Sequence, residues 1–554
     1  MVLKGLGMMW LVNLANINVD EIPVLTEEMV WEKIANSKKP KSTVPRDLPK
    51  RLFQEFSPEL ATPFCKIYQN IAKSGVWPKP WRVEIGIPLQ KKPNPVDEDQ
   101  LRIISLTSFF SKVFERFVVS WLLHYVGSQM DWGQFGGLKG SSISHYLIDL
   151  VNFILFNQDL NVPHAVLAVM IDFSKAFNRI NHNIVITILS EMGVPGWLLK
   201  IVIGFLTERE MVLRYKGGTS KTKSLPGGGP QGTLLGLFLF LILINAAGIQ
   251  HLQRHLGEHI TTKLTKRSPL QDRHMKYIDD MTMAEAINLR QKLMPNPDTS
   301  QPRPFSYHER TQQVLPEDDF NLQDNLNKLL EYCRANEMSV NKDKTKVMLF
   351  NTGREYDFLP KLSIDGESFL EVVEQFKLLG VIVRSDLRWH DNTDYICRRG
   401  YERIWMIRRL KSLGAGLDDM IEVYNRQVRS VLELSVPVWQ SNLTKQEERQ
   451  IERVQKTAFH VIMGSEYQQC NSALELLEAE RLSERRIQIC INFAKKAMKH
   501  QQYKNWLAAS PIQEPEPRTR APQPKQLKCK PVPARTGRYY DSPIPYLSRL
   551  LNEI

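Results

Sequence analysis

Three aspartates lie where predicted strands end. Asp172 closes an apolar stretch, Ala165–Phe173, that predicts a buried strand, and Asp279 and Asp280 lie where two short strands within His274–Ala284 should meet. Carboxylates on adjacent strands of one sheet would repel each other and raise their own pKa values. Mg²⁺ removes that penalty, because it binds one or two carboxylates and completes its shell with water and phosphate oxygens. The spacing therefore indicates a site for cations that activate a hydroxyl and stabilise a leaving pyrophosphate; capping and turn residues are the alternative.

A sheet and flanking helices must hold these acids, and the apolar periodicity predicts both. A helix is expected to start at Ser174, directly after the first acid, with Ser174 as its N-cap. Further helices are expected at Leu52–Gly75, Ser108–Val126 and Asp319–Asn336, and further strands at Val83–Leu89, Thr345–Phe350 and Phe376–Val383. From there to His500 the pattern is helical.

The segment Thr233–Ala247 is nearly all apolar and could be mistaken for a membrane span. It is shorter than the roughly 18–20 residues that a helix needs to cross a bilayer. A Pro-Gly-rich loop precedes it, and Asn245 interrupts its end. We therefore expect a buried core helix and no membrane partner.

The composition is that of a globular protein with excess positive charge. Of 554 residues, 42% are hydrophobic and 24% charged, and 73 Lys and Arg against 60 Asp and Glu give a net charge of +13. These values exclude a wholly disordered, collagen-like or disulfide-scaffold chain. The six cysteines are too far apart for a local zinc site. The charge favours a polyanionic partner, either nucleic acid or an anionic membrane surface.

Short motifs around the acids make the interpretation more specific. In chain order they are Arg102–Ser108 with Lys112 and Glu115, Gln134–Gly136, Ile171–Phe177, Leu225–Thr233 (LPGGGPQGT), Tyr277–Asp280 (YIDD), Lys344–Lys346, Lys377–Gly380 and Tyr424–Gly464. Any one of these motifs is weak evidence alone, but their occurrence in this order and at this spacing is strong evidence. Over roughly residues 50–500, the set resembles the motifs of a reverse transcriptase, in particular that of non-LTR (LINE-like) retrotransposons.

The resemblance implies an α+β right-hand polymerase with an antiparallel palm sheet. Fingers and palm are expected at 50–383, with an insertion at 291–318, and a helical thumb at 384–505. An N-terminal segment or linker at 1–49 precedes them, and a basic, Pro-rich, disordered tail at 506–554 follows.

Carried over residue by residue, the resemblance assigns metal-binding and catalytic roles. Asp172 and Asp279 match the metal-ligating acids, and Asp280 matches the adjacent supporting acid. The backbone carbonyl of Phe173 would also face a metal. The cofactor implied is a pair of Mg²⁺ ions, with Mn²⁺ as the alternative.

Several cations match residues that act on phosphates. Lys344 matches the lysine that protonates the pyrophosphate leaving group, and Lys346 is its rival. Lys91 or Lys92, together with Arg102, match cations that clamp the triphosphate. Ordinary surface charge is the alternative for each.

Two further positions match residues near the incoming nucleotide. Phe177 matches an aromatic gate whose ring leaves no room for a 2′-hydroxyl; a core aromatic is the alternative. Gln231 and Gly232 match the loop that approaches the nucleotide, where glycine permits a close backbone approach.

A cluster of six cations lies within fourteen residues and is interleaved with Tyr401 and Trp405. Its members are Arg398, Arg399, Arg403, Arg408, Arg409 and Lys411. This density suits phosphate contacts along a template–primer duplex, which would make binding salt-dependent. A solvated helix face is the alternative.

The activity implied is template-directed addition of deoxynucleotides to a primer 3′-hydroxyl. The partners implied are an RNA template, a DNA primer and deoxynucleoside triphosphates. No endonuclease is expected within the chain, so a separate endonuclease or a pre-existing 3′ end would provide the primer, unless the sequence is a fragment of a longer reading frame. The alternatives are a catalytically silent nucleic-acid-binding remnant and an RNA-dependent RNA polymerase, against which Phe177 argues.

Overall fold

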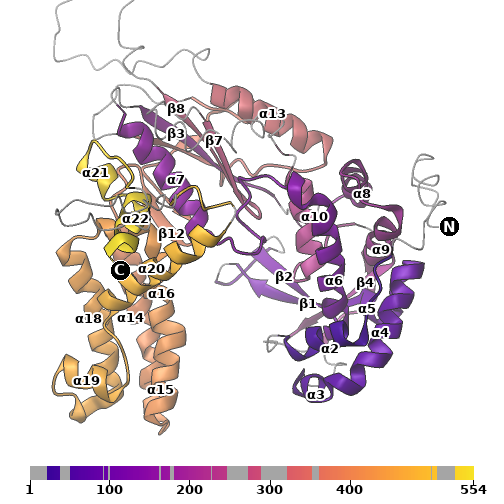
Figure 1. Ribbon diagram of the computed structural model, residues 1–554, viewed down its shortest axis with the longest axis horizontal. Coiled ribbons are helices and arrows are strands. Elements are labelled where there is room, and N and C mark those ends of the chain that lie inside the picture. Colours follow the sequence, from indigo (N-terminus) through magenta and orange to yellow (C-terminus); the bar gives the residue numbers. More distant parts are fainter. Residues whose placement is uncertain are drawn as a thin grey trace, which may run out of the picture. The chain divides into compact units, whose positions relative to one another are not determined.

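The computed structural model describes residues 22–37, 50–247, 272–287, 321–351, 361–507 and 529–553, apart from residues 92, 98, 99, 161–163, 175, 176, 178, 179, 226, 246, 501 and 530. The chain divides into two compact units (Figure 1). Unit 1 comprises 1–137, 173–251 and 326–341, and unit 2 comprises 138–172, 252–325 and 342–554. Because the units interleave along the chain, the consecutive domains drawn from the sequence stay predictions.

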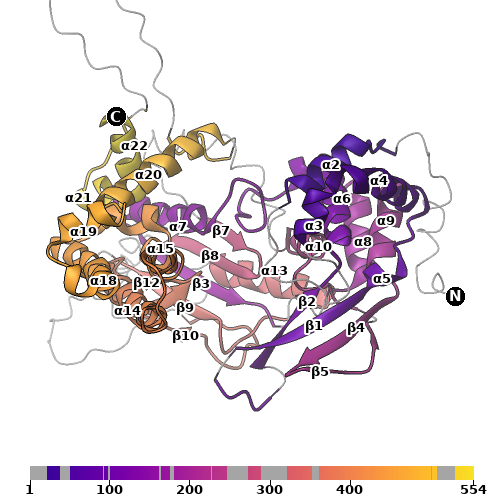
Figure 2. The same ribbon diagram turned by 90° about the horizontal axis from the view of Figure 1, so that it is seen from below.

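Unit 1 contains a five-stranded sheet, which Figure 2 shows along one side of its helices. Strands β2 (Leu101–Leu106), β1 (Val83–Gln90), β4 (Arg209–Tyr215) and β5 (Gly218–Thr219) are neighbours in that order, and β6 (Lys223–Leu225) pairs with β4. β1 pairs antiparallel with β2 and parallel with β4. The helices are α2 (Glu27–Ala35), α3 (Lys50–Glu55), α4 (Ser57–Ser74), α5 (Lys79–Arg82), α6 (Phe109–Val126), η4 (Gly127–Gln129), α8 (His182–Glu191), α9 (Gly196–Leu206), α10 (Leu234–Asn245) and most of α13 (Asn321–Ala335).

Apolar faces at helical spacing build the core of unit 1. On α4, Cys65, Tyr68 and Ala72 are buried on one side, as the i, i+3, i+7 pattern requires. The Tyr68 ring stacks 5.0 Å from that of Phe114 on α6, and Trp77 contacts the same ring edge-on at 5.1 Å. These rings join two helices that the sequence analysis predicted separately.

The helix predicted at Thr233–Ala247 is confirmed as α10. Nearly all of its residues are buried, as expected for a helix that is apolar on every side. Among the described residues, no helix has both the length and the apolar character that crossing a membrane requires.

Unit 2 contains the sheet that carries the predicted acids. Its strand order is β10 (Glu371–Val372), β9 (Lys346–Phe350), β3 (Ala165–Asp172), β8 (Asp280–Ile287) and β7 (Asp272–Tyr277). β3 pairs antiparallel with both β8 and β9. A separate hairpin joins β11 (Gln375–Leu378) and β12 (Val381–Arg384), so the single strand predicted at Phe376–Val383 is two strands around a turn.

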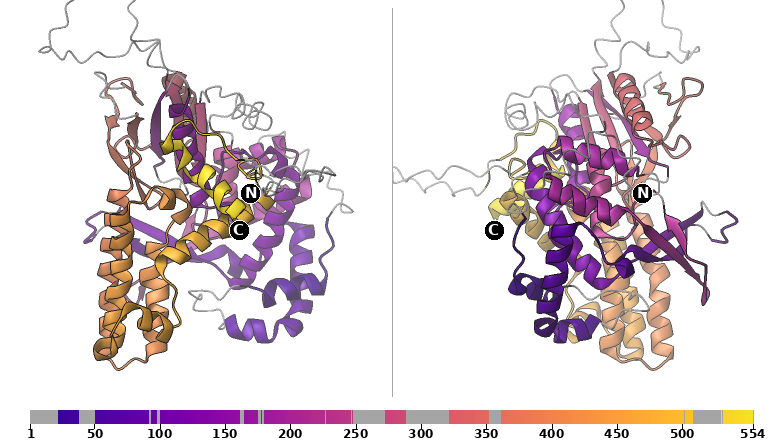
Figure 3. Two further views of the ribbon diagram at one scale, coloured as in Figure 1. Left: turned by 60° about the vertical axis from the view of Figure 1, so that its left-hand side comes forward. Right: turned by 90° about the vertical axis from the view of Figure 1, so that its right-hand side faces the viewer.

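Helices complete unit 2. α7 (Ile143–Gln158), which the sequence analysis did not predict, packs on β3 and β7. Helices α14 and α18 run side by side among the orange helices of Figure 3. The helices after β12 are α14 (His390–Ser412), α15 (Leu417–Val423), η7 (Tyr424–Arg429), α16 (Ser430–Leu432), α17 (Val436–Trp439), η8 (Gln440–Asn442), α18 (Lys445–Met463), η9 (Gly464–Glu466), α19 (Cys470–Leu476), α20 (Leu482–Lys499), α21 (Gly537–Tyr540) and α22 (Pro543–Glu553).

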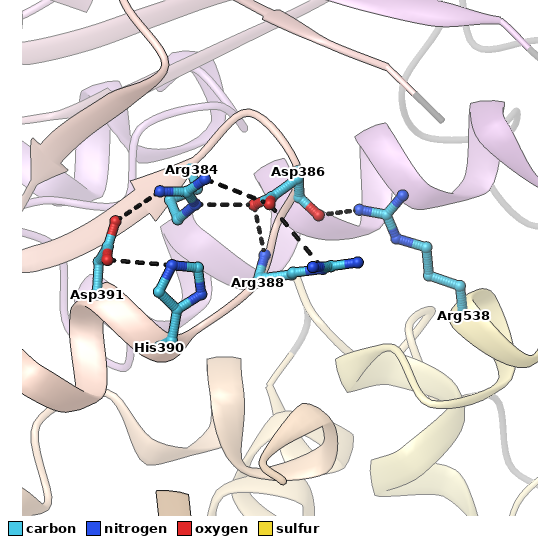
Figure 4. A network of polar contacts seen from close by, with 6 residues as sticks. All are labelled: Arg384, Asp386, Arg388, His390, Asp391 and Arg538. Atoms are coloured by element: carbon cyan, nitrogen blue, oxygen red, sulfur yellow. Dashed lines mark hydrogen bonds and ion pairs between the residues drawn. The ribbon is translucent and has the colours of Figure 1, made fainter. Parts of the chain in front are cut away.

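The disorder predicted for the whole of 506–554 is wrong for residues 537–553. α22 packs on α7, α17 and α20, and its apolar residues Ile544, Leu547 and Leu551 are buried. Arg538 of α21 donates a hydrogen bond to the backbone carbonyl of Asp386 (Figure 4). The cation therefore takes part in the fold rather than forming a free basic tail.

The loop that receives Arg538 is itself tied together by charge. The Arg384 guanidinium donates to the Asp386 carboxylate at 3.1 Å and to Asp391 at 2.8 Å, which connects β12 to the first turn of α14 (Figure 4). His390 lies 3.1 Å from the same Asp391 carboxylate.

The helix predicted from Ser174 can be followed only from His182 onward, because residues 175, 176, 178 and 179 lie outside the described residues. The Ser174 amide donates to the Ser339 carbonyl at 2.8 Å. The helix that follows is α8, which begins at His182, and its N-cap is Asn181, whose side chain accepts from the amides of Asn183 and Ile184. The predicted insertion at 291–318, Lys92 and the chain at 508–528 lie outside the described residues.

Candidate active site

Two of the three predicted acids lie opposite each other at one end of the unit 2 sheet. Asp172 is the last residue of β3, Asp280 is the first of β8, and the two are cross-strand partners. Partners of this kind have Cα atoms about 4.5–5.5 Å apart and side chains on the same face. The register therefore brings two carboxylates together, which is unfavourable unless a cation compensates them.

The strand explains why the first carboxylate reaches solvent at this point. β3 is a central strand, and Ala165–Ile171 are all buried. Asp172 is the first residue of the strand to be exposed, with 34% of its side chain accessible. A fully apolar strand thus ends in an acid at the border of the core.

The third acid lies in the turn between β7 and β8. Tyr277 and Asp280 pair across the hairpin, which leaves Ile278 and Asp279 as the two turn residues. Ile278 has φ 61, a conformation that is costly for a β-branched side chain. Asp280 is thus a strand residue rather than a turn residue, and Asp279 is its neighbour at the tip.

A lysine compensates the acid on β3. Lys344 Nζ lies 3.1 Å from Asp172 Oδ2, and 65% of the lysine side chain is exposed. The amide of Asp172 donates to the hydroxyl of the buried Thr345 at 3.4 Å. Lys346 instead pairs with Glu371 at 2.5 Å. Of the two rival lysines, Lys344 is the one that contacts the acid.

These groups line a cleft of about 380 Å³ within unit 2. Acids, lysines and apolar side chains share its wall. The lining residues are Met170, Ile171, Asp172, Asp280, Met281, Asp343, Lys344, Lys346, Phe376, Lys377 and Leu378. The lysines suit an anionic ligand, and the acids suit cations bound together with that ligand.

The donor set fits Mg²⁺ without forming a complete cage. Among the described residues, no three His, Cys, Asp or Glu side chains converge as a ready metal centre. Mg²⁺ does not require one, because it binds through one or two carboxylates and takes its other ligands from water and phosphates. The paired Asp172 and Asp280 provide hard oxygen donors of that kind.

A buried tyrosine supports the acid end of β8. The Tyr146 hydroxyl, on α7, donates to Thr282 Oγ1 at 2.5 Å. Burial raises the pKa of Tyr146 well above its ordinary value, and the nearby charges of Asp280 and Asp149 act in the same direction. The phenol therefore stays protonated and keeps donating to β8.

The predicted gate and loop residues lie in unit 1. The half-buried Phe177 packs its ring 4.9 Å from that of Phe240 on α10, and its carbonyl accepts from the Gly229 amide at 2.8 Å. The Gln231 carbonyl accepts from the Ser105 amide of β2 at 2.7 Å. The gate segment and the glycine-rich loop are thus joined through backbone contacts.

Glycine is required after Gln231. Gly232 has φ 119, and a Cβ there would lie 2.9 Å from the Ser105 carbonyl oxygen. Both the conformation and the close approach exclude a side chain.

The predicted triphosphate cations lie on the β1–β2 hairpin of unit 1. Arg102 is exposed on β2, opposite Leu89 of β1. Lys91 follows β1, and its amide donates to the Gln100 carbonyl at 2.8 Å.

The predicted nucleic-acid-binding cations of α14 differ in their contacts. Arg398, Arg408 and Arg409 are exposed. Arg403 donates to the Gln427 carbonyl at 2.7 Å, and Lys411 donates to the carbonyls at the end of α18, at 2.8 and 3.0 Å.

The remaining cation, Arg399, pairs with Glu402 at 2.9 Å. Tyr401 and Trp405 are 39% and 58% exposed, and with Arg398 and Arg408 they follow one face of the helix. The exposed members therefore form a basic and aromatic stripe, while Arg403 and Lys411 hold the helix to its neighbours.

Sequence reasoning missed part of the cleft. Phe376 and Lys377 line it, although Lys377–Gly380 was noted only as a motif. Lys377 Nζ donates to the Tyr395 hydroxyl at 2.7 Å, which joins the β11–β12 hairpin to α14. No residue pattern revealed this contact, because it depends on how the hairpin packs.

Comparison with known proteins bears on this site. A family model described as reverse transcriptase (RNA-dependent DNA polymerase) matches residues 89–383, just over half of the chain. The chain is 22% identical over 347 residues to the probable RNA-directed DNA polymerase from transposon BS of Drosophila melanogaster, covering 62% of this chain and 34% of that protein. It is 30% identical over 179 residues to the RNA-directed DNA polymerase from mobile element jockey of the same species, covering 32% and 19%.

The chain thus spans about a third or less of the length of these curated relatives. A solved structure of telomerase from Candida albicans, in complex with a fragment of telomeric RNA, aligns with 81% of this chain and 68% of its own, with a TM-score of 0.33 and 12% identity. The family match and the two transposon relatives confirm the resemblance that the motifs predicted.

Proposed function

We propose that this chain, which belongs to the reverse transcriptase (RNA-dependent DNA polymerase) family, adds deoxynucleotides to a primer 3′-hydroxyl on an RNA template. The observation that carries the proposal is the in-register pair of Asp172 and Asp280, with Lys344 beside it. Phosphoryl transfer needs mainly positioning and charge stabilisation, and this cleft provides both acids and cations.

Asp172, Asp279, Asp280 and the Phe173 carbonyl would hold two Mg²⁺ ions. When bound, such ions lower the pKa of the primer hydroxyl and stabilise the charge on the leaving pyrophosphate. The pairing of β3 with β8 sets the Asp172 and Asp280 carboxylates on one face of the sheet, and Asp279 lies in the adjoining turn.

Lys344 would provide the proton for the leaving pyrophosphate. Its ammonium lies at the cleft and remains largely exposed, so it can reach a phosphate oxygen by rotating away from Asp172. Lys346 is the weaker candidate because Glu371 already engages its ammonium.

The nucleotide would be selected by residues of unit 1. Phe177 would exclude a 2′-hydroxyl, Gln231 and Gly232 would contact the nucleotide, and Lys91 and Arg102 would clamp its triphosphate. Packing of the Phe177 ring on Phe240 supports a rigid gate, since a fixed ring discriminates by exclusion.

The template–primer duplex would contact the stripe of Arg398, Tyr401, Trp405 and Arg408 on α14. Phosphate contacts of this kind position a duplex without reading its sequence. Arg403 and Lys411 would act indirectly, by holding the helix.

Primer extension on a defined RNA template tests the proposal. Wild-type protein should incorporate deoxynucleotides in strong preference to ribonucleotides, and Asp279→Ala should abolish incorporation. Equal use of ribonucleotides would indicate an RNA polymerase. Template binding without any Mg²⁺-dependent synthesis would indicate a silent binding protein, and an unchanged rate for Asp279→Ala would refute the metal assignment.

A further inference from the structure

We propose that the buried carboxylate of Glu115 is a positioning residue that holds the Gln231 loop in its binding conformation. The inference rests on the proposed function, because it assigns Gln231 to nucleotide binding. Glu115 lies on α6 and is fully buried within unit 1.

Glu115 anchors the start of the helix that follows the loop. One oxygen, Oε2, accepts from the amides of Leu234 and Leu235 at 2.8 and 3.0 Å. These are the first two residues of α10, and Gln231 lies three residues before them. The first amides of a helix have no partner within it and carry positive partial charge, so a carboxylate is the strongest acceptor available to them.

The other side of the loop is anchored to β2. The Ser105 amide donates to the Gln231 carbonyl, and the Ser105 carbonyl oxygen closely approaches Gly232. β2 and α6 are consecutive in the chain, separated only by residues 107 and 108. A single segment, 101–126, therefore grips the loop at two points, through Ser105 and through Glu115.

The same segment carries Arg102, which the proposed function assigns to the triphosphate. Fixing the loop to this segment thus fixes Gln231 relative to Arg102. If the contact with Glu115 were lost, the loop would keep its bonds to Ser105 and to the Phe177 carbonyl, but the start of α10 would no longer be fixed to α6.

The surroundings explain how a carboxylate is tolerated at a fully buried position. Arg209 is 3% exposed, lies 3.5 Å from the equally buried Glu84, and its charge also acts on Glu115. The Ser111 hydroxyl donates to Glu115 Oε1 at 3.3 Å. Burial raises the pKa of Glu115, whereas the Leu235 amide, Arg209 and Lys112 lower it. Burying a carboxylate carries a large desolvation cost, so packing alone does not explain why an acid occupies this position.

Three variants separate positioning from packing. Glu115→Met keeps the volume but removes the acceptor, so KM for deoxynucleotides should rise about tenfold, in line with the cost of a misplaced binding group. Glu115→Gln keeps an oxygen acceptor and should restore a KM within about twofold of wild type. Thr26→Ala removes the N-cap of α2 in the same unit, and should lower stability without changing KM.

Amide exchange across residues 229–237 measures the grip without requiring activity. Exchange should be faster in Glu115→Met and near wild type in Glu115→Gln. If Glu115→Met does not fold, Leu234→Pro is the alternative variant. It removes one of the two amides that donate to Glu115, at the first position of α10, where proline is tolerated. KM and the exchange rate should also rise in this variant, but by less than in Glu115→Met.

Unchanged KM and exchange in a folded Glu115→Met or Leu234→Pro protein would overturn the inference. So would a Glu115→Gln protein as defective as Glu115→Met. Absence of synthesis by wild type, with exchange behaving as expected, would instead overturn the proposed function and leave the grip in place.

Discussion

At the scale of residues, the cleft depends on how opposed carboxylates are compensated. Asp172 and Asp280 are cross-strand neighbours, and the Lys344 ammonium offsets the first of them. Because 65% of the Lys344 side chain is exposed, its ammonium could turn from Asp172 toward a leaving phosphate, as the proposed function requires.

Replacing Lys344 by Ala should slow single-turnover nucleotide addition by roughly 10²-fold or more, the usual contribution of a general acid. Lys344→Arg should not restore the rate, because an arginine guanidinium in a protein does not release its proton. A larger loss in Lys346→Ala than in Lys344→Ala would assign the role to the rival lysine.

The sequence predicted the acids because each adjoins a strand with a clear apolar pattern, whereas the choice of Lys344 came from the resemblance to reverse transcriptases. It could not predict that Lys377 and Phe376 line the same cleft, since that depends on the packing of the β11–β12 hairpin. Nor could it show that the Arg403 and Lys411 head groups bond to backbone carbonyls, since those contacts depend on how α14 packs.

At the scale of elements, one buried acid anchors the chain where it enters the C-terminal helices. Asp159, 6% exposed, accepts from the amides of Arg535 and Thr536 at 2.9 and 2.7 Å, and from the Thr536 hydroxyl at 2.7 Å. These bonds precede α21 and fix where the chain returns to α7. The basic, Pro-rich composition of the tail led to a prediction of disorder, although the spacing of Ile544, Leu547 and Leu551 is that of a helix with one apolar face.

Asp159→Ala should lower the free energy of unfolding by about 2 kcal/mol, since it removes the charge-assisted hydrogen bonds that the buried carboxylate accepts from the Arg535 and Thr536 amides. Asp159→Asn keeps one acceptor oxygen and should lose less. Chemical denaturation of the two variants beside wild type checks this. Equal stability of Asp159→Ala and wild type would mean that the C-terminal helices are not held at this point.

A histidine at the start of α7 should make stability depend on pH. Burial, and after it the nearby His500, lowers the pKa of His145 from 6.5 to about 4. The ring packs 4.1 Å from Tyr503, and its Nδ1 lies 2.8 Å from the Ser142 hydroxyl.

Below pH 6.5 the unfolded chain binds a proton that the folded chain binds only near pH 4. The stability contribution is therefore complete above pH 6.5 and falls by about 3 kcal/mol as pH drops to 4. His145→Phe keeps the ring packing and should remove this part of the pH dependence. Parallel stability curves for wild type and His145→Phe between pH 7 and 4 would contradict the assignment.

At the scale of the whole molecule, the chain has the α+β right-hand polymerase fold expected of the reverse transcriptase family to which it belongs. The net charge of +13 predicted a polyanionic partner, and part of that charge lies on the exposed stripe of α14. The proposed catalytic cleft carries acids and the proposed binding stripe carries cations, and both proposals began from sequence patterns. Sequence patterns could not predict how the chain segments interleave into two units, because that depends on contacts between residues far apart in the chain.

Binding to an RNA–DNA duplex should weaken as salt rises, through release of counterions. Arg408→Ala should reduce the slope of log affinity against log salt by about 1, the value expected for one phosphate contact. Arg51→Ala removes the same charge from an 88% exposed side chain on α3 and should leave the slope unchanged. Equal effects of the two variants would show that the stripe contributes only general charge.

The central claim is that the carboxylates at the end of β3 and β8 perform nucleotide transfer. The most direct measurement is single-turnover primer extension with Mg²⁺ on an RNA template, comparing wild type, Asp172→Asn and Asp418→Asn, which makes the same change on the exposed first turn of α15. We predict that Asp172→Asn loses roughly 10³-fold or more of the rate while binding template–primer normally, and that Asp418→Asn extends like wild type. Extension by Asp172→Asn at the wild-type rate would contradict the account.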